Sequence, residues 1–502
     1  MRSAVLLLGL LATACAGPRG VRASPLTTPS LPQIPEVESV GGVATLTLRA
    51  ALDARGRPAF FWDGREIAPT IRVRPGDRIK LHYINDLPEY CGLGLVSESN
   101  LHFHGLTTSP DVHSDDVITT KVAPGRSFDY DVKIGRDQPP GLYWYHPHPH
   151  GLANWEIGNG MAGAIIVDGI ADAVPQIAGL REQLIILRDI PIDHSVAAAE
   201  RQTALKVQPA AAPPADPDEV GPPCGIETTA QPTINGMPSA TIGIRPHERQ
   251  LWRILNASAH RHFVIAFSDG ERFGLVAQDG VPLAYAPHGP RIEMRSRLVL
   301  PPGGRAEIVV SGPTSHQYLM SRCYDAGPRG DINPENILAM TIDDGGTTRM
   351  PRVPPALGLR PSDRYRSIPV PAVRRTVRFE EDGNGFYIDK RSYDPTAPPL
   401  ITARSGTVEE WTLVNQTDEV HTFHIHQVHF IVESIDGKAK RDRRWLDVVD
   451  LPPQRRDGGR AQPSTVKVLI DFRNPVVRGT FLFHCHIVDH EDGGMMAKIR
   501  VI

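Results

Sequence analysis

The sequence predicts an all-β protein made of three consecutive copies of one domain, each a small antiparallel β-sandwich or barrel. Its 45 Gly and 47 Pro are spread over 502 residues, with short Val/Ile/Thr runs between them, which is typical of many strands joined by tight turns. One strand-turn-strand pattern occurs three times along the chain. Clusters of histidines lie in the first and third copies and not in the second.

The repeated pattern occupies residues 71–85, 242–256 and 401–415, where apolar and polar residues alternate around a turn. In each copy an Arg lies eleven residues before an Asn: Arg74 and Asn85, Arg245 and Asn256, Arg404 and Asn415. Successive copies are 171 and 159 residues apart, a period that indicates whole domains and not a solenoid. We expect these domains at about residues 36–172, 180–345 and 365–502.

Two connecting segments stand out by composition. Residues 207–223 carry six prolines and several alanines, which predicts an extended insertion within the second domain. Residues 343–363 are expected to link the second and third domains. The 54 basic and 57 acidic side chains nearly balance, so the charge gives no reason to expect nucleic acid or an anionic membrane as a partner.

Residues 1–23 predict an export signal. Arg2 precedes an apolar run, Ala4–Ala14, that is too short to span a bilayer, and no later segment is apolar enough to do so. Two cleavage points stay open. One follows a lipoprotein-like box and would leave Cys15 lipidated, and the other, before Ser24, would release a soluble protein. We therefore expect an exported protein of the periplasm or cell envelope, with a lipid anchor at Cys15 as the alternative to a free form.

The remaining cysteines are few. If Cys15 is removed or lipidated and Cys485 binds a metal, an oxidising compartment permits one disulfide among Cys91, Cys224 and Cys323. The sequence does not choose the pair.

The histidine clusters predict a metal centre. Their sequences are HFHG (102–105), WYHPHPHG (144–151), HTFHIHQ (421–427) and HCHIVDHEDGGMM (484–496). Two histidines separated by one residue on a strand face the same side, about 7 Å apart. Such a pair alone is more often exposed than a ligand, but four pairs supply eight imidazoles. No single metal takes eight nitrogens, so the pattern predicts a multinuclear site.

A second ligand set lies within the same stretches. His421, His490, Cys485 and Met495 are the two imidazoles, thiolate and weak thioether typical of a blue-copper electron-transfer site. His150 and His429 continue the alternation, but we assign them to the surface or to positions beside the ligands.

All four motifs, in this order, resemble those of the multicopper oxidases, the group that includes laccases and bacterial cuprous oxidases. The resemblance extends from about residue 40 to the end of the chain. It implies three consecutive cupredoxin-like Greek-key domains and four copper ions: one type 1, one type 2 and a type 3 pair.

The family pattern transfers residue by residue. It implies that type 1 copper is held by His421, Cys485 and His490, with Met495 axial. It implies that type 2 copper is held by His102 and His424. The type 3 pair would be held by His104, His146, His148, His426, His484 and His486. Two positions depart from the pattern, because Thr422 replaces the usual Pro and Gln427 the usual Gly.

The resemblance also implies the reaction. A reductant would lose one electron at a time near a type 1 histidine, and four electrons would reduce dioxygen to two waters. Water formation consumes protons, so acids are expected near the cluster. Glu491 matches a family position thought to relay protons, and either Asp115 or Asp116 is the second candidate. The alternative for both aspartates is a solvated turn.

The reductant is expected to be a small phenol or aromatic amine, as in laccases. Only nine methionines occur and none cluster outside the ligand region, which argues against a thioether path for Cu(I). Asp418 and Glu419 precede His421 and would accept a cation or a phenol proton, or form a plain charged turn. A cuprous oxidase of copper tolerance is the alternative.

Two further alternatives are a copper nitrite reductase and a non-enzymatic scaffold of cupredoxin repeats. A nitrite reductase places its catalytic copper between subunits, whereas one chain here supplies all four motifs. A scaffold that has lost its coppers should lack ligands, and here none is missing.

Overall fold

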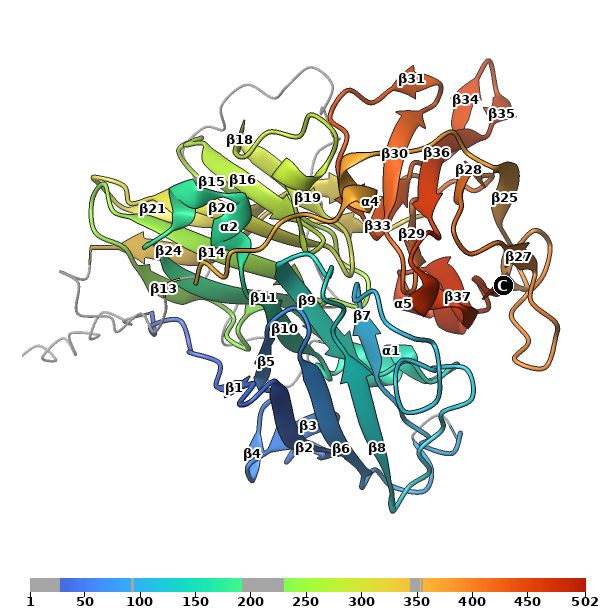
Figure 1. Cartoon of the computed structure of the whole chain (residues 1–502), viewed down its shortest axis with the longest axis horizontal. Helices are drawn as coiled ribbons and strands as arrows, with labels where there is room; N and C mark the ends of the chain where they lie inside the picture. Colours follow the sequence, from blue (N-terminus) through green and yellow to red (C-terminus); the bar gives the residue numbers. More distant parts are fainter. Residues whose placement is uncertain (1–27, 92–93, 192–229, 344–352, 354) are drawn as a thin grey trace, which may run out of the picture.

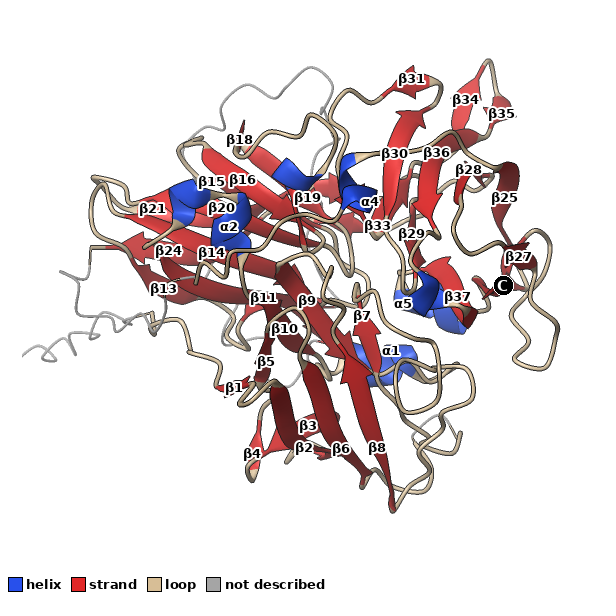
Figure 2. Ribbon diagram, in the orientation of Figure 1, coloured by secondary structure: helices blue, strands red, loops and turns tan. Residues whose placement is uncertain are grey.

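The computed structural model describes residues 28–91, 94–191, 230–343, 353 and 355–502. The export signal, Cys15, the insertion at 207–223, Cys224 and part of the expected second linker (344–352 and 354) lie outside these residues. Strands dominate the described chain, and its helices are short (Figure 2), which confirms the all-β prediction. Two sheets form within each of the three predicted ranges, although the domain boundaries themselves stay predictions.

The first domain packs two five-stranded sheets (blue to teal in Figure 1). One sheet has the order β4 (Arg65–Glu66), β3 (Pro58–Trp62), β2 (Val43–Leu52), β6 (Arg78–Asn85), β8 (Arg126–Lys133). The other has the order β1 (Glu36–Glu38), β5 (Thr70–Val73), β10 (Gly163–Val167), β9 (Gly141–His146), β7 (His102–His104). The helices of this part are α1 (Ala153–Gly158), α2 (Ile170–Ala173) and the 3-10 turn η1 (Pro175–Ile177).

The second domain repeats this arrangement. One sheet has the order β12 (Ala230–Ile234), β11 (Arg181–Pro191), β14 (Arg249–Asn256), β20 (Arg305–Ser311), β16 (Phe273–Gln278), β17 (Val281–Pro282), with β18 (Glu293–Arg295) beside β16. The other has the order β13 (Ala240–Gly243), β24 (Asn336–Ile342), β21 (Gln317–Arg322), β15 (Phe263–Phe267), β19 (Arg297–Leu300). Outside them lie η2 (Leu283–Tyr285) and the pair β22 (Tyr324–Asp325) and β23 (Ile332–Asn333).

The third domain follows α4 (Asp363–Arg366). One sheet has the order β26 (Gly385–Ile388), β25 (Val373–Asp382), β28 (Val408–Asn415), β36 (Ser464–Asp471), β30 (Phe430–Ile435), β31 (Lys438–Ala439), with β32 (Trp445–Leu446) beside β30. The other has the order β27 (Ile401–Ala403), β38 (Met496–Val501), β37 (Gly479–Cys485), β29 (His421–Ile425), β33 (Val448–Leu451). The remaining elements are β34 (Arg455–Asp457), β35 (Arg460–Gln462), η3 (Pro475–Val477) and α5 (Val488–Asp492).

The expectation of purely antiparallel sheets is wrong. β2 pairs with β6, β11 with β14 and β25 with β28 in parallel. Parallel neighbours need a crossover, and here the chain crosses to the facing sheet and returns between the two strands. Each predicted strand-turn-strand repeat is that return. Within each domain, its first strand (β5, β13 or β27) lies in one sheet and its second strand (β6, β14 or β28) lies in the facing sheet.

The repeated Asn has the same role in each domain. The side-chain amide of Asn85 donates to the carbonyls of Ser97 and Val122 at 2.7 Å, and its oxygen accepts the Leu87 amide at 3.0 Å. Asn256 and Asn415 make the corresponding bonds to backbone groups of their own domains. All three Asn side chains are fully buried. Their hydrogen bonds therefore fix the path of the chain where it leaves β6, β14 and β28.

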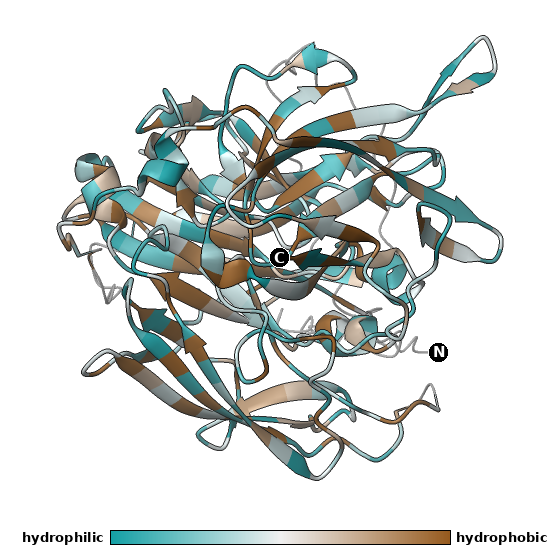
Figure 3. Ribbon diagram, turned by 45° about the vertical axis from the view of Figure 1, so that its right-hand side comes forward, coloured by the Kyte–Doolittle hydropathy of each residue, from teal (hydrophilic) through white to brown (hydrophobic). Residues whose placement is uncertain are grey.

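Each sandwich encloses its own apolar core, and the hydrophobic segments lie mostly on the strands (Figure 3). Smaller apolar clusters join the domains. In one of them, Ala153 and Ile157 of α1, Ala259 of the second domain and Val488 of α5 pack together. The three domains therefore meet at one place, where β7, α1 and α5 lie near one another in Figure 1.

Replacing Asn415 by Ala should lower the free energy of unfolding by at least about 2 kcal/mol, because it leaves several buried backbone groups without partners. Urea denaturation would measure the loss, and Asn384→Ala at an exposed position serves as the matched control. Equal stability of the two variants would contradict the role assigned to the repeated Asn.

Candidate metal centre

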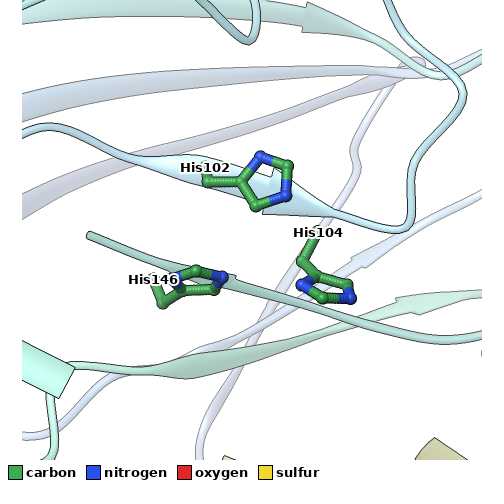
Figure 4. A group of neighbouring side chains, drawn as sticks. All are labelled: His102, His104 and His146. Atoms are coloured by element: carbon green, nitrogen blue, oxygen red, sulfur yellow. The ribbon is translucent and has the colours of Figure 1, made fainter. Parts of the chain in front are cut away.

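Strands from the first and third domains carry the predicted ligands to one buried region. His102 and His104 lie on β7, and His146 ends the neighbouring β9, as Figure 4 shows. The third domain contributes β29 and β37, which pair so that His424 lies opposite His484. All ten predicted histidine ligands and Cys485 are at most 6% exposed.

Eight of the imidazoles form one cluster, as the four motifs predicted. The ring nitrogens of His102, His104 and His146 lie within 4.8 Å of one another, and so do those of His148, His426 and His484. His484 Nε2 is 3.2 Å from both His148 Nε2 and His426 Nε2. On the other side, His486 Nε2 is 3.3 Å from His104 Nδ1. The cluster therefore offers several groups of three converging nitrogens.

The chemistry of these rings fits metal ions. Nε2 of His102, His146 and His424 is buried and has no hydrogen-bond partner among the described residues. Burial lowers the pKa of all eight histidines, so their imidazoles are neutral near pH 7. Neutral imidazole is the form that binds metal. A buried polar atom without a partner is costly unless an ion takes that place.

A second group lies on the far side of β37. The Nδ1 atoms of His421 and His490 are 3.0 Å apart, and each is 3.7 Å from the Cys485 sulfur. Met495 is fully buried in the same core, and its carbonyl accepts the Cys485 amide at 3.0 Å. Two imidazoles and one thiol fit one mononuclear site. Because Cys485 lies between His484 and His486 in sequence, one strand connects both groups.

Comparison with known proteins agrees with this geometry. Two family models, both described as multicopper oxidase, match residues 47–172 and 367–502, together more than half of the chain. The chain belongs to the multicopper oxidases.

A multicopper oxidase from Staphylococcus haemolyticus is 25% identical over 92% of this chain and 89% of its own length. The cell division protein FtsP of Yersinia pestis is 28% identical over 98% of this chain and 96% of its own length. The crystal structure of McoA, a multicopper oxidase of Aquifex aeolicus, superposes with a TM-score of 0.69 at 22% identity, over 95% of this chain and all of McoA. This likeness confirms the three cupredoxin-like domains. As a member of the family, the chain is a copper-dependent oxidoreductase that uses dioxygen and a reductant.

The second domain of this multicopper oxidase supplies no predicted ligand, yet it reaches the cluster. Arg305 on β20 is fully buried and makes two 2.6 Å bonds to Asp447 of the third domain. Asp447 Oδ1 lies 3.2 Å from His104 Nε2, and the Asp447 carbonyl accepts His424 Nδ1 at 2.7 Å. At Gly303, which has a φ of +81°, an added Cβ would lie 3.0 Å from His486 Nε2. Arg305, Gly303 and Asp447 were not foreseen, because nothing local in the sequence marks them.

Of the two candidate aspartates, Asp115 contacts the cluster. Both of its oxygens lie 3.0 Å from His102 Nδ1, and one accepts the Phe103 amide at 2.9 Å. Asp116 instead accepts backbone amides of Ile118 and Thr119. Gln427 donates its side-chain amide to Asp115 and has a φ of +58°. The usual Gly would relieve this backbone strain but has no side-chain amide to donate to Asp115.

Glu491 lies on the opposite side of the cluster. Its carboxylate oxygens are 3.1 Å from His484 Nδ1 and 3.4 Å from His148 Nδ1. Burial raises the pKa of Glu491 to about 7. The Glu491 carboxyl group therefore lies against two predicted ligands, one from the first domain and one from the third.

A cavity of about 300 Å³ opens at the His490 edge. Its acidic lining residues are Asp331, Glu381, Asp382, Glu419 and Asp489, and His260, His262 and Arg329 are its basic ones. Glu419 Oε1 lies 3.4 Å from His490 Nε2, and burial together with neighbouring Glu381 raises the pKa of Glu419 to about 9. Asp418 does not face the cavity but bonds to Gln454 and Arg456, so it belongs to a charged turn.

His150 and His429 lie at the surface and beside the ligands, as expected for them. His150 is exposed and contacts the Tyr393 ring, whereas His429 is buried 3.9 Å from Asp447. Neither joins the two ligand groups. Cys91 and Cys485 are free thiols and Cys323 is disulfide-bonded, so Cys91 takes no part in the expected disulfide. Cys224 lies outside the described residues.

His260, which the second domain contributes to the cavity, provides a test of these electrostatics. It lies 3.8 Å from Asp189 and 3.5 Å from Asp489. Although burial lowers its pKa, the two carboxylates raise the pKa of His260 to about 9. The ordinary value is about 6.5. Protonated His260 therefore stabilises the folded protein fully below about pH 6.5, and this stabilisation is lost as the pH rises through 9.

The stability difference between the wild type and His260→Gln should shrink by about 1–2 kcal/mol between pH 6 and pH 10, after allowance for solvent screening at this partly exposed ring. Urea denaturation at each pH measures it. His316→Gln, at an exposed position, should show no such change. A difference that is independent of pH would contradict the ion pairs assigned to His260.

Proposed function

We propose that this multicopper oxidase couples four one-electron oxidations of a small reductant to the reduction of dioxygen to two waters. The observation that carries this proposal is the position of Cys485. It belongs to the mononuclear group, and its two neighbours in sequence are histidines of the eight-imidazole cluster. When bound, the four coppers supply the one-electron steps and the site of dioxygen reduction. The residues of the chain hold them, connect them and control protons.

The ligand assignment follows the two groups. His421, Cys485, His490 and Met495 would hold type 1 copper. His102 and His424, whose buried Nε2 atoms have no hydrogen-bond partner in the described part of the chain, would hold type 2 copper. The type 3 pair would be held by His104, His146, His148, His426, His484 and His486. The peptide bonds from Cys485 to its two histidine neighbours give electrons a short covalent path.

Two carboxyl groups next to the cluster are placed to donate protons. Glu491 touches His148 and His484, and Asp115 holds Nδ1 of His102. Glu491 is 1% exposed, so a proton there is kept from bulk water and lies beside the cluster. We propose Glu491 as a proton donor for water formation and Asp115 as its counterpart at the type 2 side.

Glu491→Gln keeps the shape of the side chain but removes the ionisable proton. Oxygen reduction should slow by about 10²–10⁴-fold, whereas anaerobic bleaching of the blue band by the reductant should keep its wild-type rate. Stopped-flow absorbance with an oxygen electrode measures both. Unchanged turnover would remove Glu491 from the proton path.

The cavity at His490 supports a laccase-like reductant, a small phenol or aromatic amine. Glu419 at 3.4 Å from His490 accepts a hydrogen bond from a hydroxyl or amine that reaches the same edge. The carboxyl groups of the lining offer acceptors for the N–H or O–H of such a reductant. No methionine is among the described residues that line the cavity, and thioethers are what Cu(I) prefers. A cuprous oxidase remains the alternative.

Oxygen uptake by the copper-loaded enzyme tests this proposal, with an aromatic amine, a phenol and Cu(I) compared in one buffer. We expect kcat/KM to be higher for the amine and the phenol than for Cu(I). At pH 10, above the raised pKa of Glu419, kcat/KM for the amine should fall about tenfold in Glu419→Gln, since a hydrogen bond to a charged group is lost. Asp418→Asn is the matched control, because the neighbouring acid does not face the cavity. Faster uptake with Cu(I) would instead indicate a cuprous oxidase.

A non-enzymatic scaffold is the second candidate, and it is kept because one relative, FtsP, is named for cell division and not for an oxidation. The complete ligand set, buried and converging, supports the enzyme. A copper-loaded chain without oxygen uptake on any of the three reductants would support the scaffold.

We also propose that the protein is exported, as the composition of residues 1–23 predicts. The disulfide at Cys323 supports an oxidising compartment. Among the residues that the structure describes, no helix is long and apolar enough to cross a membrane. Mass spectrometry of the mature N-terminus would distinguish a lipidated Cys15 from a free chain beginning at Ser24.

A further inference from the structure

Thr422 directly follows the ligand His421, at a position where multicopper oxidases usually carry Pro. Its backbone N–H donates to the Cys485 sulfur, with a nitrogen–sulfur distance of 3.4 Å. Pro has no N–H, so this hydrogen bond exists only because the residue is not Pro. Both residues are fully buried, so the sulfur is shielded from bulk solvent.

The surrounding contacts fix the direction of this amide. The Thr422 hydroxyl donates to Asp450 Oδ1 at 2.9 Å, and its carbonyl accepts the His486 amide at 2.6 Å. Asp450 in turn lies 3.0 Å from His262 Nε2 and accepts the Tyr324 hydroxyl at 3.1 Å. Thr422 is therefore held on both sides, between a type 1 ligand and residues of the second domain.

An N–H directed at the sulfur has an electronic consequence. The reduced copper–thiolate pair carries one more electron than the oxidised pair, so its sulfur is more negative. The positive end of the N–H dipole therefore stabilises the reduced form more than the oxidised form. Hydrogen bonding around the Cys sulfur is a known determinant of the potential of blue-copper sites. The Cys485 sulfur also accepts the backbone N–H of Ile487, so Thr422 provides a second donor.

We propose that the Thr422 N–H raises the reduction potential of the type 1 site and so extends the enzyme to reductants that give up electrons less readily. This inference rests on the proposed function, because it assigns copper to His421, Cys485 and His490. Thr422 acts through Cys485 and tunes the site without touching the reductant.

The test compares Thr422→Pro with Thr422→Ala. The Pro variant loses the N–H and the hydroxyl, whereas the Ala variant loses only the hydroxyl. Pro should be tolerated here, because the sulfur is the acceptor of the Thr422 N–H and no strand pairing bond is removed. Redox titration of the blue band measures the potential of each protein.

We expect Thr422→Pro to have a lower potential than the wild type and Thr422→Ala to match the wild type. The rate of blue-band bleaching should fall in the Pro variant, and more for a weak reductant than for a strong one. Equal potentials in the Pro and Ala variants would overturn the inference. A wild-type protein that develops no blue band would instead overturn the proposed function.

If the Pro variant takes up no copper, the N–H···S bond can be measured directly in the wild-type protein. Protein loaded with ¹¹³Cd and labelled with ¹⁵N at threonine should show scalar coupling between the metal and the Thr422 amide proton, which passes through the N–H···S bond. Thr422→Ala, with ¹⁵N-alanine, should retain the coupling. Its absence in both proteins would overturn the inference.

Discussion

The buried ion pair between Arg305 and Asp447 ties the three domains to one set of histidines. Arg305 belongs to the second domain, bonds both oxygens of Asp447 in the third, and donates to the Leu142 carbonyl of the first at 3.3 Å. Asp447 in turn holds His104 and His424, which come from different domains. A buried pair of this kind stabilises little by itself, but loss of one partner leaves an uncompensated charge, at a cost of about 3–5 kcal/mol. The middle domain is therefore part of the metal centre without carrying a ligand.

The cost of bringing the ligands together explains why such a pair is needed. Eight imidazoles share a small volume from which water is excluded, and their pKa values are all lowered by burial. Some of their ring nitrogens approach one another to 3.2–3.3 Å, and other ring nitrogens of the cluster have no hydrogen-bond partner among the described residues. Only packing between domains keeps these dipoles together in the absence of metal. The free energy of copper binding would offset this cost, so folding and metal binding are coupled.

Much of this was predictable from local patterns. The three strand-turn-strand copies could be found because the repeated Asn performs the same backbone bonds in each domain. The ligand motifs could be found because alternation on a strand places His102 and His104, or His484 and His486, on one face. The parallel pairings could not be foreseen, since a crossover between facing sheets leaves no periodic signal.

Long-range contacts account for the rest. Asp115 and Asp116 are neighbours in sequence, and only the folded chain shows which of them reaches His102. Arg305 and His260 are ordinary residues of the second domain until the fold brings them to the cluster and the cavity. The two departures from the family pattern were visible as Thr422 and Gln427, but their partners, the Cys485 sulfur and the Asp115 carboxylate, lie 63 and 312 residues away in sequence.

We propose that one chain, folded as three domains, builds both a mononuclear and a trinuclear copper site. The most direct measurement is the number of coppers per chain, obtained by native mass spectrometry of metal-free protein titrated with copper. We predict saturation at four coppers per chain, with the blue band developing in full. Saturation at one copper, or none, would contradict the account, because the eight converging imidazoles would then have another purpose.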